Sequence, residues 1–87
     1  MASRKVTGGK YLEVEVRSGE VEIYGDFFMH PESEIDNVET LVSEKLNDDV
    51  DGIEEAINEF MDDCGVELHG ASARDVAELA VEARKND

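Results

Sequence analysis

Two alternating segments joined by two residues constrain the fold of this sequence more than any other feature. Residues 10–17 and 20–27 both alternate between apolar and polar side chains, which is typical of half-buried strands. Ser18-Gly19 between them predicts a short hairpin turn. The apolar positions are Leu12, Val14 and Val16 in the first segment and Val21, Ile23 and Phe27 in the second.

A two-residue turn also predicts the register of the hairpin. Val14 then faces Ile23, and both apolar sets point to the same side of the sheet. The same register sets Glu15 against Glu22 on the outer side, a pair that destabilises the hairpin at low salt. Arg4 to Thr7 is compatible with a short third strand at the edge, ahead of a turn at Gly8-Gly9.

The second half of the chain has helical spacing instead. Pro31 begins it, since proline suits the first helical position. Asn47 to Gly52 separates the first helix from the second, Gly65 is a suitable C-terminal stop, and Ser72 with Asp75 predicts the cap of a third. The apolar stripes are Ile35, Val38, Leu41, Val42 and Leu46, then Ile53, Ala56, Ile57, Phe60, Met61 and Cys64, then Val76, Leu79, Ala80 and Ala83.

These patterns predict a two-layer α+β fold. An antiparallel β-meander of two long strands, with a short third strand as an option, is followed by about three helices that pack on one sheet face. Residues 1–87 form one domain, with a β half at about 4–28 and an α half at about 31–85. Residues 66–68 are either extended or loop.

The charge balance narrows the classes of partner. The chain has 23 Asp and Glu but only 8 Lys and Arg, a net charge of −15. Nucleic acids and anionic membranes are therefore excluded as expected partners, because both are bound mainly through Lys and Arg. No secretory signal or membrane-spanning stretch is recognisable, so we expect a cytoplasmic protein. We also expect it to work in concentrated salt, as in a halophile; an ordinary acidic domain is the alternative.

The sequence offers no complete catalytic or metal site. Cys64, His69 and His30 are too few for a zinc site, and Cys64 is expected to be a small buried residue of the second helix. The segment Asn47 to Gly52 mimics the start of a calcium loop, but Asn58 stands where the bidentate glutamate belongs. No serine lies in a nucleophile motif. We expect no cofactor bound by this chain alone.

The segment from Tyr24 to Pro31 stands out for its aromatic residues. If Phe27 lies in the core of a regular strand, Phe28 points outward and makes an apolar patch on an acidic surface. Such patches often mark partner sites. Alternatively, the chain bends and both rings enter the core.

Several of these segments together resemble one protein family. Gly8-Gly9-Lys10, the alternation from Leu12 to Arg17, the Ser18-Gly19 turn and the run from Tyr24 to Pro31 resemble the accessory domain of lipoate–protein ligases. The resemblance is strongest over residues 7–46. In many ligases this domain follows the catalytic domain in one chain, whereas in some archaea it is a separate small subunit.

The resemblance implies a function that composition does not show. Lipoate–protein ligases activate lipoate with ATP and transfer the lipoyl group to a lysine of lipoyl-acceptor domains. The accessory part supports the adenylation step by docking on the catalytic subunit, which holds lipoate and ATP. By this resemblance, the candidate partner-binding residues are Gly25, Asp26, Phe27, Phe28 and His30.

A second resemblance gives the alternative function. The strand–strand–helix order is also similar to that of iron–sulfur scaffold proteins, which depend on several cysteines. With Cys64 alone, this chain fits a stand-alone binding or adaptor domain of that fold without a cluster.

Overall fold

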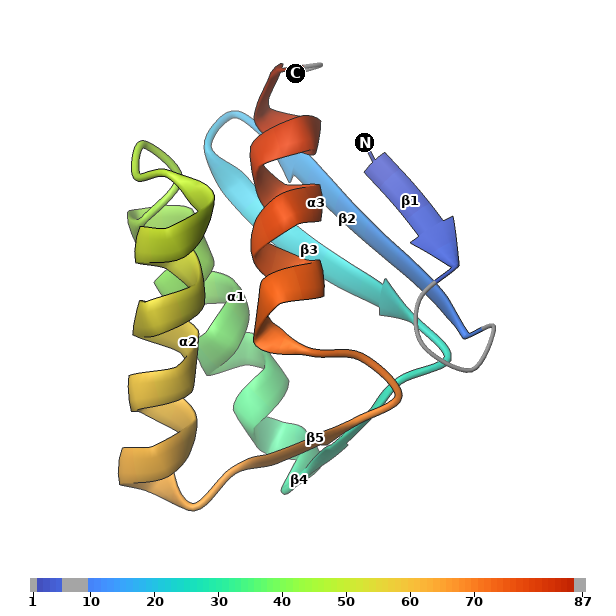
Figure 1. Ribbon diagram of the computed structural model, residues 1–87, viewed down its shortest axis with the longest axis vertical. Helices are drawn as coiled ribbons and strands as arrows, with labels where there is room; N and C mark the ends of the chain where they lie inside the picture. Colours follow the sequence, from blue (N-terminus) through green and yellow to red (C-terminus); the bar gives the residue numbers. More distant parts are fainter. Residues whose placement is uncertain (1, 6–9, 86–87) are drawn as a thin grey trace.

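The main sheet is an antiparallel meander with the predicted register. The computed structural model describes residues 2–5 and 10–85 (Figure 1). Val14 pairs with Ile23 and Glu15 with Glu22, as predicted. Ser18 and Gly19 both have positive φ, 51° and 81°, which a two-residue turn between twisted strands favours. The strands, in spatial order, are β1 (Ala2–Lys5), β2 (Tyr11–Arg17) and β3 (Glu20–Gly25).

The third strand begins earlier than predicted. β1 pairs with β2 and starts at Ala2, two residues before the expected Arg4. The rest of that prediction, including the Gly8-Gly9 turn, lies outside the described residues.

Three α-helices complete the α+β fold. They are α1 (Ile35–Glu44), α2 (Val50–Cys64) and α3 (Ala73–Lys85). α1 packs on β3 and α3 packs on β2 and β1, while α2 packs against α1 and α3. Figure 1 accordingly shows α2 and β1 at opposite sides of the molecule. None of the helices in the described part of the chain is long and apolar enough to cross a membrane.

The first helix starts later than the proline rule predicted. Pro31 is extended, with φ −71° and ψ 146°, and precedes a 3₁₀ turn at Glu32–Glu34 that leads into α1. The predicted break from Asn47 to Gly52 is also too long, because α2 already begins at Val50. Asp49 is the N-cap of α2 and accepts a hydrogen bond from the Gly52 N–H at 2.8 Å, so Gly52 lies in the first helical turn.

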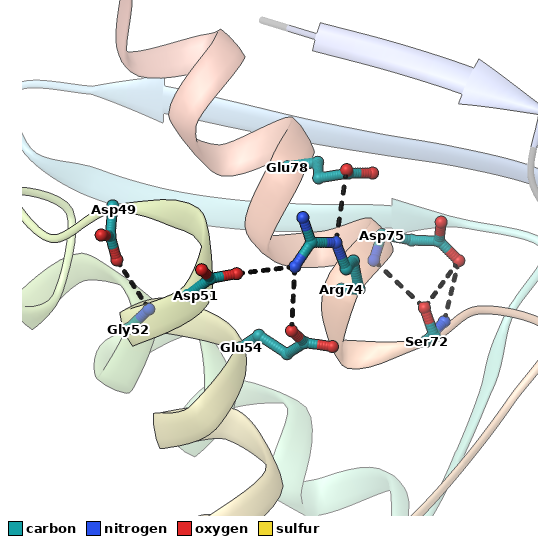
Figure 2. Close-up of polar contacts among 8 residues, drawn as sticks. All are labelled: Asp49, Asp51, Gly52, Glu54, Ser72, Arg74, Asp75 and Glu78. Carbon is teal, nitrogen blue, oxygen red and sulfur yellow. Dashed lines mark hydrogen bonds and ion pairs between the residues drawn. The ribbon is translucent and has the colours of Figure 1, made fainter.

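α1 ends at Glu44, so Leu46 lies after the helix to which its spacing assigned it. The predicted end of α2 and the predicted start of α3 are confirmed. Gly65 ends α2 in the left-handed conformation, with φ 65°. At the start of α3, the Ser72 hydroxyl accepts from the Asp75 N–H at 3.1 Å, and the Asp75 carboxylate accepts from the Ser72 N–H at 3.1 Å (Figure 2). This reciprocal pair is a capping box.

The core lies between the sheet and the helices. The inward residues predicted for the hairpin are buried, except that Phe27 is half-buried. α3 presents small residues to the core, and these let its backbone approach the sheet. They are Ala73, Ala77, Ala80 and Ala83. Cys64 is exposed, so its expected burial is wrong: the apolar stripe of α2 runs past the end of the core, and Phe60 and Met61 are already half-buried.

A second, two-stranded sheet was not predicted. β3 ends at Gly25, and the chain forms a new strand, β4 (Phe28–His30). β4 pairs with β5 (Glu67–His69), so residues 66–68 are largely extended and the second half of the chain contributes a strand. Figure 1 shows this small sheet below α3, towards the open end of the β2–β3 hairpin and far from the turn that joins β2 to β3.

Candidate functional site

The β4–β5 sheet carries the candidate site on its outer face. Met29 points inward and is buried, and Leu68 opposite it is half-buried against the core. Alternation along the two strands therefore turns four exposed side chains outward. These are Phe28 and His30 on β4 and Glu67 and His69 on β5, with Phe28 opposite His69 and His30 opposite Glu67.

Three rings lie close together on this face, and we call Phe28, His30 and His69 the ring cluster. Phe28 is 50% exposed. Its ring centre lies 6.4 Å from that of His30, with the planes 14° apart, and 6.2 Å from that of His69. Of the two orientations that the sequence left open, the outward one is therefore correct for Phe28.

A shallow groove of about 490 Å³ adjoins the ring cluster at Phe28 and extends to Ile23 and Tyr24 of the main sheet. Tyr24, 45% exposed, lies on its wall and donates a hydrogen bond from its hydroxyl to Glu22. The groove is lined by Ile23, Tyr24, Gly25, Phe27, Phe28, Met29, Glu32 and Ile35. The outward aromatic side chains thus border a largely apolar depression on a strongly acidic protein.

The structure separates the five predicted partner-binding residues into two groups. A Cβ at Gly25 would lie 2.2 Å from the Tyr11 carbonyl oxygen. The Asp26 N–H donates to that same oxygen at 2.8 Å, and the Asp26 carboxylate accepts from the Tyr11 N–H at 3.3 Å. Gly25 and Asp26 therefore hold the chain where it leaves the main sheet. Phe27 is half-buried, whereas Phe28 and His30 are available to a partner.

His69 and Glu67 belong to the site but were not among the predicted residues. Both come from β5, which reaches β4 from the other half of the chain. Reading residues 66–68 as extended was the one signal that could have suggested a strand there. The partner strand could not be identified from three residues.

A second groove, of about 560 Å³, lies between β3 and α1 and is acidic. Five carboxylates line it, from Glu20, Glu22, Asp36, Glu39 and Glu44. Burial raises the pKa of Glu39, a hydrogen bond from the Ile23 N–H opposes that rise, and the charges of Asp36 and Glu22 add to it. Among the described residues, no three His, Cys, Asp or Glu side chains are placed to hold a metal ion.

The acidic segment before α2 has structural contacts. Asp49 caps the helix, as described above, and Asp51 accepts a hydrogen bond from Arg74 of α3 at 2.7 Å (Figure 2). Glu54 and Glu78 also pair with Arg74, at 3.2 and 3.5 Å. Arg74 thus ties α2 to α3, and the acidic segment forms the N-terminus of α2, with Asp49 as its N-cap and Asp51 in its first turn.

The described side chains thus place exposed rings beside a groove. Comparisons with protein-family models, curated proteins and solved structures gave no match.

Proposed function

We propose that this chain is the small accessory subunit of a two-part lipoate–protein ligase. In this role it docks on a separate catalytic subunit and supports ATP-dependent adenylation of lipoate, before the lipoyl group passes to a lysine of an acceptor domain. Lipoate and ATP are bound by the catalytic subunit. The chain itself contributes a docking surface rather than reacting groups.

The observation that carries the proposal is the position of Phe28. The segment from Gly25 to Pro31 bears the resemblance to ligase accessory domains, and it places a half-exposed phenylalanine at the centre of the ring cluster. Exposed apolar patches often mark partner sites, and Phe28 together with the largely apolar groove beside it forms such a patch on an acidic protein. Gly25 and Asp26 fix the start of this segment against the backbone of Tyr11, whose carbonyl oxygen accepts a hydrogen bond from the Asp26 N–H.

Docking can assist adenylation without supplying a catalytic group. A subunit that braces or covers the catalytic site orients the reacting groups and excludes water that would hydrolyse the activated intermediate. We further propose that the complex works in the cytoplasm at high salt, where the repulsion among the carboxylates of this chain is screened.

The test is lipoate-dependent exchange between ATP and pyrophosphate in 1 M KCl. A candidate catalytic subunit, taken from the same organism, is assayed alone, with this chain, and with its Phe28→Ala variant; this chain is also assayed alone. We expect exchange in the mixture with the wild-type chain only. Equal exchange with and without this chain would refute the proposed role and favour the stand-alone adaptor domain.

A further inference from the structure

The surroundings of the ring cluster restrict the chemistry of what can bind there. Glu67 lies opposite His30 in the strand register, and Glu32 lines the adjoining groove. Glu22 belongs to the separate acidic groove, but it accepts a hydrogen bond from the hydroxyl of Tyr24, which lines the groove beside the ring cluster. An anionic group brought to the ring cluster would therefore meet carboxylates on more than one side.

The same charges argue against a second copy of this chain as the occupant. Two molecules that meet through their ring clusters would bring Glu67 and Glu32 of each copy together, on chains that each carry a net charge of −15. Lys10 lies near Gly70, the residue that follows β5. The Lys10 Cγ is 3.8 Å from the position that a Cβ on Gly70 would occupy. Lys10 is outnumbered by Glu67 and Glu32, so the described surroundings of the ring cluster stay acidic.

A cationic and planar group fits these observations. The face of an aromatic ring attracts cations, and arginine is favoured over lysine because its flat guanidinium stacks on rings and is more weakly hydrated. A guanidinium over Phe28 could also donate paired hydrogen bonds to the Glu67 carboxylate, an arrangement that suits its fork of N–H groups. Arginine is moreover enriched among the residues that dominate protein interfaces.

We propose that the ring cluster receives an arginine side chain of the catalytic subunit, with the guanidinium over Phe28 and paired with Glu67. This inference rests on the proposed function, which supplies the partner. It adds the chemistry of the contact: an arginine in an apolar setting on the partner, facing an aromatic and acidic surface on this chain.

The first experiment uses this chain alone. Amide chemical shifts are followed by NMR in 0.1 M KCl during titration with N-acetyl-arginine amide and, separately, with N-acetyl-lysine amide. We expect larger shifts with the arginine probe, centred on Phe28, Glu67 and His69, and loss of these shifts in Phe28→Leu. Equal shifts with both probes, or shifts elsewhere in the chain, would overturn the assignment of an arginine site.

The second experiment measures binding to the catalytic subunit by calorimetry in 1 M KCl. Phe28→Leu keeps an apolar side chain and Glu67→Gln keeps the shape, so each removes one part of the contact. We expect each to raise the Kd about tenfold. The matched controls are Tyr11→Leu, which removes an exposed ring outside the groove, and Glu55→Gln, which removes one charge from α2; both should bind like the wild type.

The outcomes distinguish the two proposals. If the wild-type chain is required for pyrophosphate exchange but Phe28→Leu and Glu67→Gln bind unchanged, the proposed function stands and the arginine contact is wrong. If the wild-type chain neither binds the catalytic subunit nor affects exchange, the proposed function fails and the contact with that partner fails with it. A melting temperature close to that of the wild type confirms that each variant is folded.

Discussion

The side-chain carboxylate of Glu39 accepts a hydrogen bond from the backbone N–H of Ile23, with 2.6 Å between Oε2 and the nitrogen. One turn further along α1, the Ser43 hydroxyl accepts from the Val21 N–H at 2.9 Å. These N–H groups lie on the edge of β3 that does not face β2. α1 thus occupies the donors that another strand would need, which protects this edge from adding a foreign chain.

Glu39 should make the stability of the protein depend on pH. Its pKa in the folded protein is raised, chiefly by burial, so between its ordinary value of 4.5 and the raised value the native state binds more protons than the unfolded chain. The contribution of Glu39 to the free energy of unfolding therefore increases as pH falls from neutral. It is lost as pH rises through the pKa of Glu39 in the folded protein. Glu39→Gln keeps an acceptor for Ile23 without the charge, so we expect a higher melting temperature than the wild type at pH 7 and 0.1 M KCl.

Thermal melts between pH 7 and pH 4.5 test this expectation. The advantage of Glu39→Gln should shrink as pH falls, because the wild-type carboxyl becomes neutral. Glu39→Ala loses the acceptor and should melt below the wild type, whereas Glu44→Gln, an exposed acid of the same groove, reports the effect of charge alone. Equal destabilisation by Glu39→Gln and Glu39→Ala at pH 7 would show that the ionised carboxylate is required.

Arg74 should stabilise the contact between α2 and α3. It pairs with Asp51 and Glu54 of α2 and with Glu78 of its own helix, and its pKa is raised, chiefly by the hydrogen bond to Asp51 (Figure 2). Arg74→Gln would leave these carboxylates close together without the cation. We expect a lower melting temperature at 0.1 M KCl and a smaller loss at 2 M KCl, since salt screens the repulsion.

Lys45→Gln is the matched control for Arg74→Gln, because it removes the same charge from an exposed position after α1. Circular dichroism melts of both variants at the two salt concentrations separate a local effect from the change in net charge. The proposed role of Arg74 is wrong if both variants lose the same stability at 0.1 M KCl.

Gly25 should tolerate no side chain. Its φ of 147° is unfavourable for other residues, and a Cβ would lie 2.2 Å from the Tyr11 carbonyl oxygen, which also accepts the Asp26 N–H. Gly25→Ala must therefore displace the backbone that leads from β3 into β4. We expect a loss of about 3 kcal/mol or more, a size reached by strain at special backbone positions.

Gly19→Ala is the comparison for that loss. Gly19 also has positive φ, 81°, but a Cβ there meets nothing within 4 Å, so the cost is conformational only and about 1 kcal/mol. Urea titration of both variants measures the two losses. Similar losses of stability in the two variants would mean that the backbone around Gly25 and Tyr11 moves apart to accept the Cβ without a further loss of stability.

The predictable parts of this structure were those set by neighbours in the sequence. Alternation and the Ser18-Gly19 turn were enough for the β2–β3 register, and Ser72 and Asp75 were enough for the α3 cap. The β4–β5 pairing joins two three-residue strands far apart in the sequence, which are too short to show a period. His69 and Glu67 were missed for that reason. Cys64 was misplaced because a stripe does not reveal where the core ends.

The acidic outer face of the hairpin should make stability depend on salt. Glu15 faces Glu22 across β2 and β3, although Arg17 also pairs with Glu15 and the Tyr24 hydroxyl donates to Glu22. Like charges directly opposite one another destabilise a sheet, whereas an opposite pair contributes about 0.2–1 kcal/mol. We expect the wild-type melting temperature to rise from 0.1 M to 2 M KCl, and Glu22→Lys to raise it at 0.1 M KCl.

Glu20→Lys makes the same change in net charge at the next cross-strand pair on the same face of the sheet. There the new lysine faces Arg17, so the cross-strand effect has the opposite sign. Differential scanning calorimetry should show Glu22→Lys melting above Glu20→Lys at 0.1 M KCl, with the difference largely gone at 2 M, because the Debye length falls from about 10 Å at 0.1 M to about 3 Å at 1 M. If both variants gain equally at low salt, relief of net charge alone accounts for the salt dependence, and the Glu15–Glu22 pair has no specific part in it.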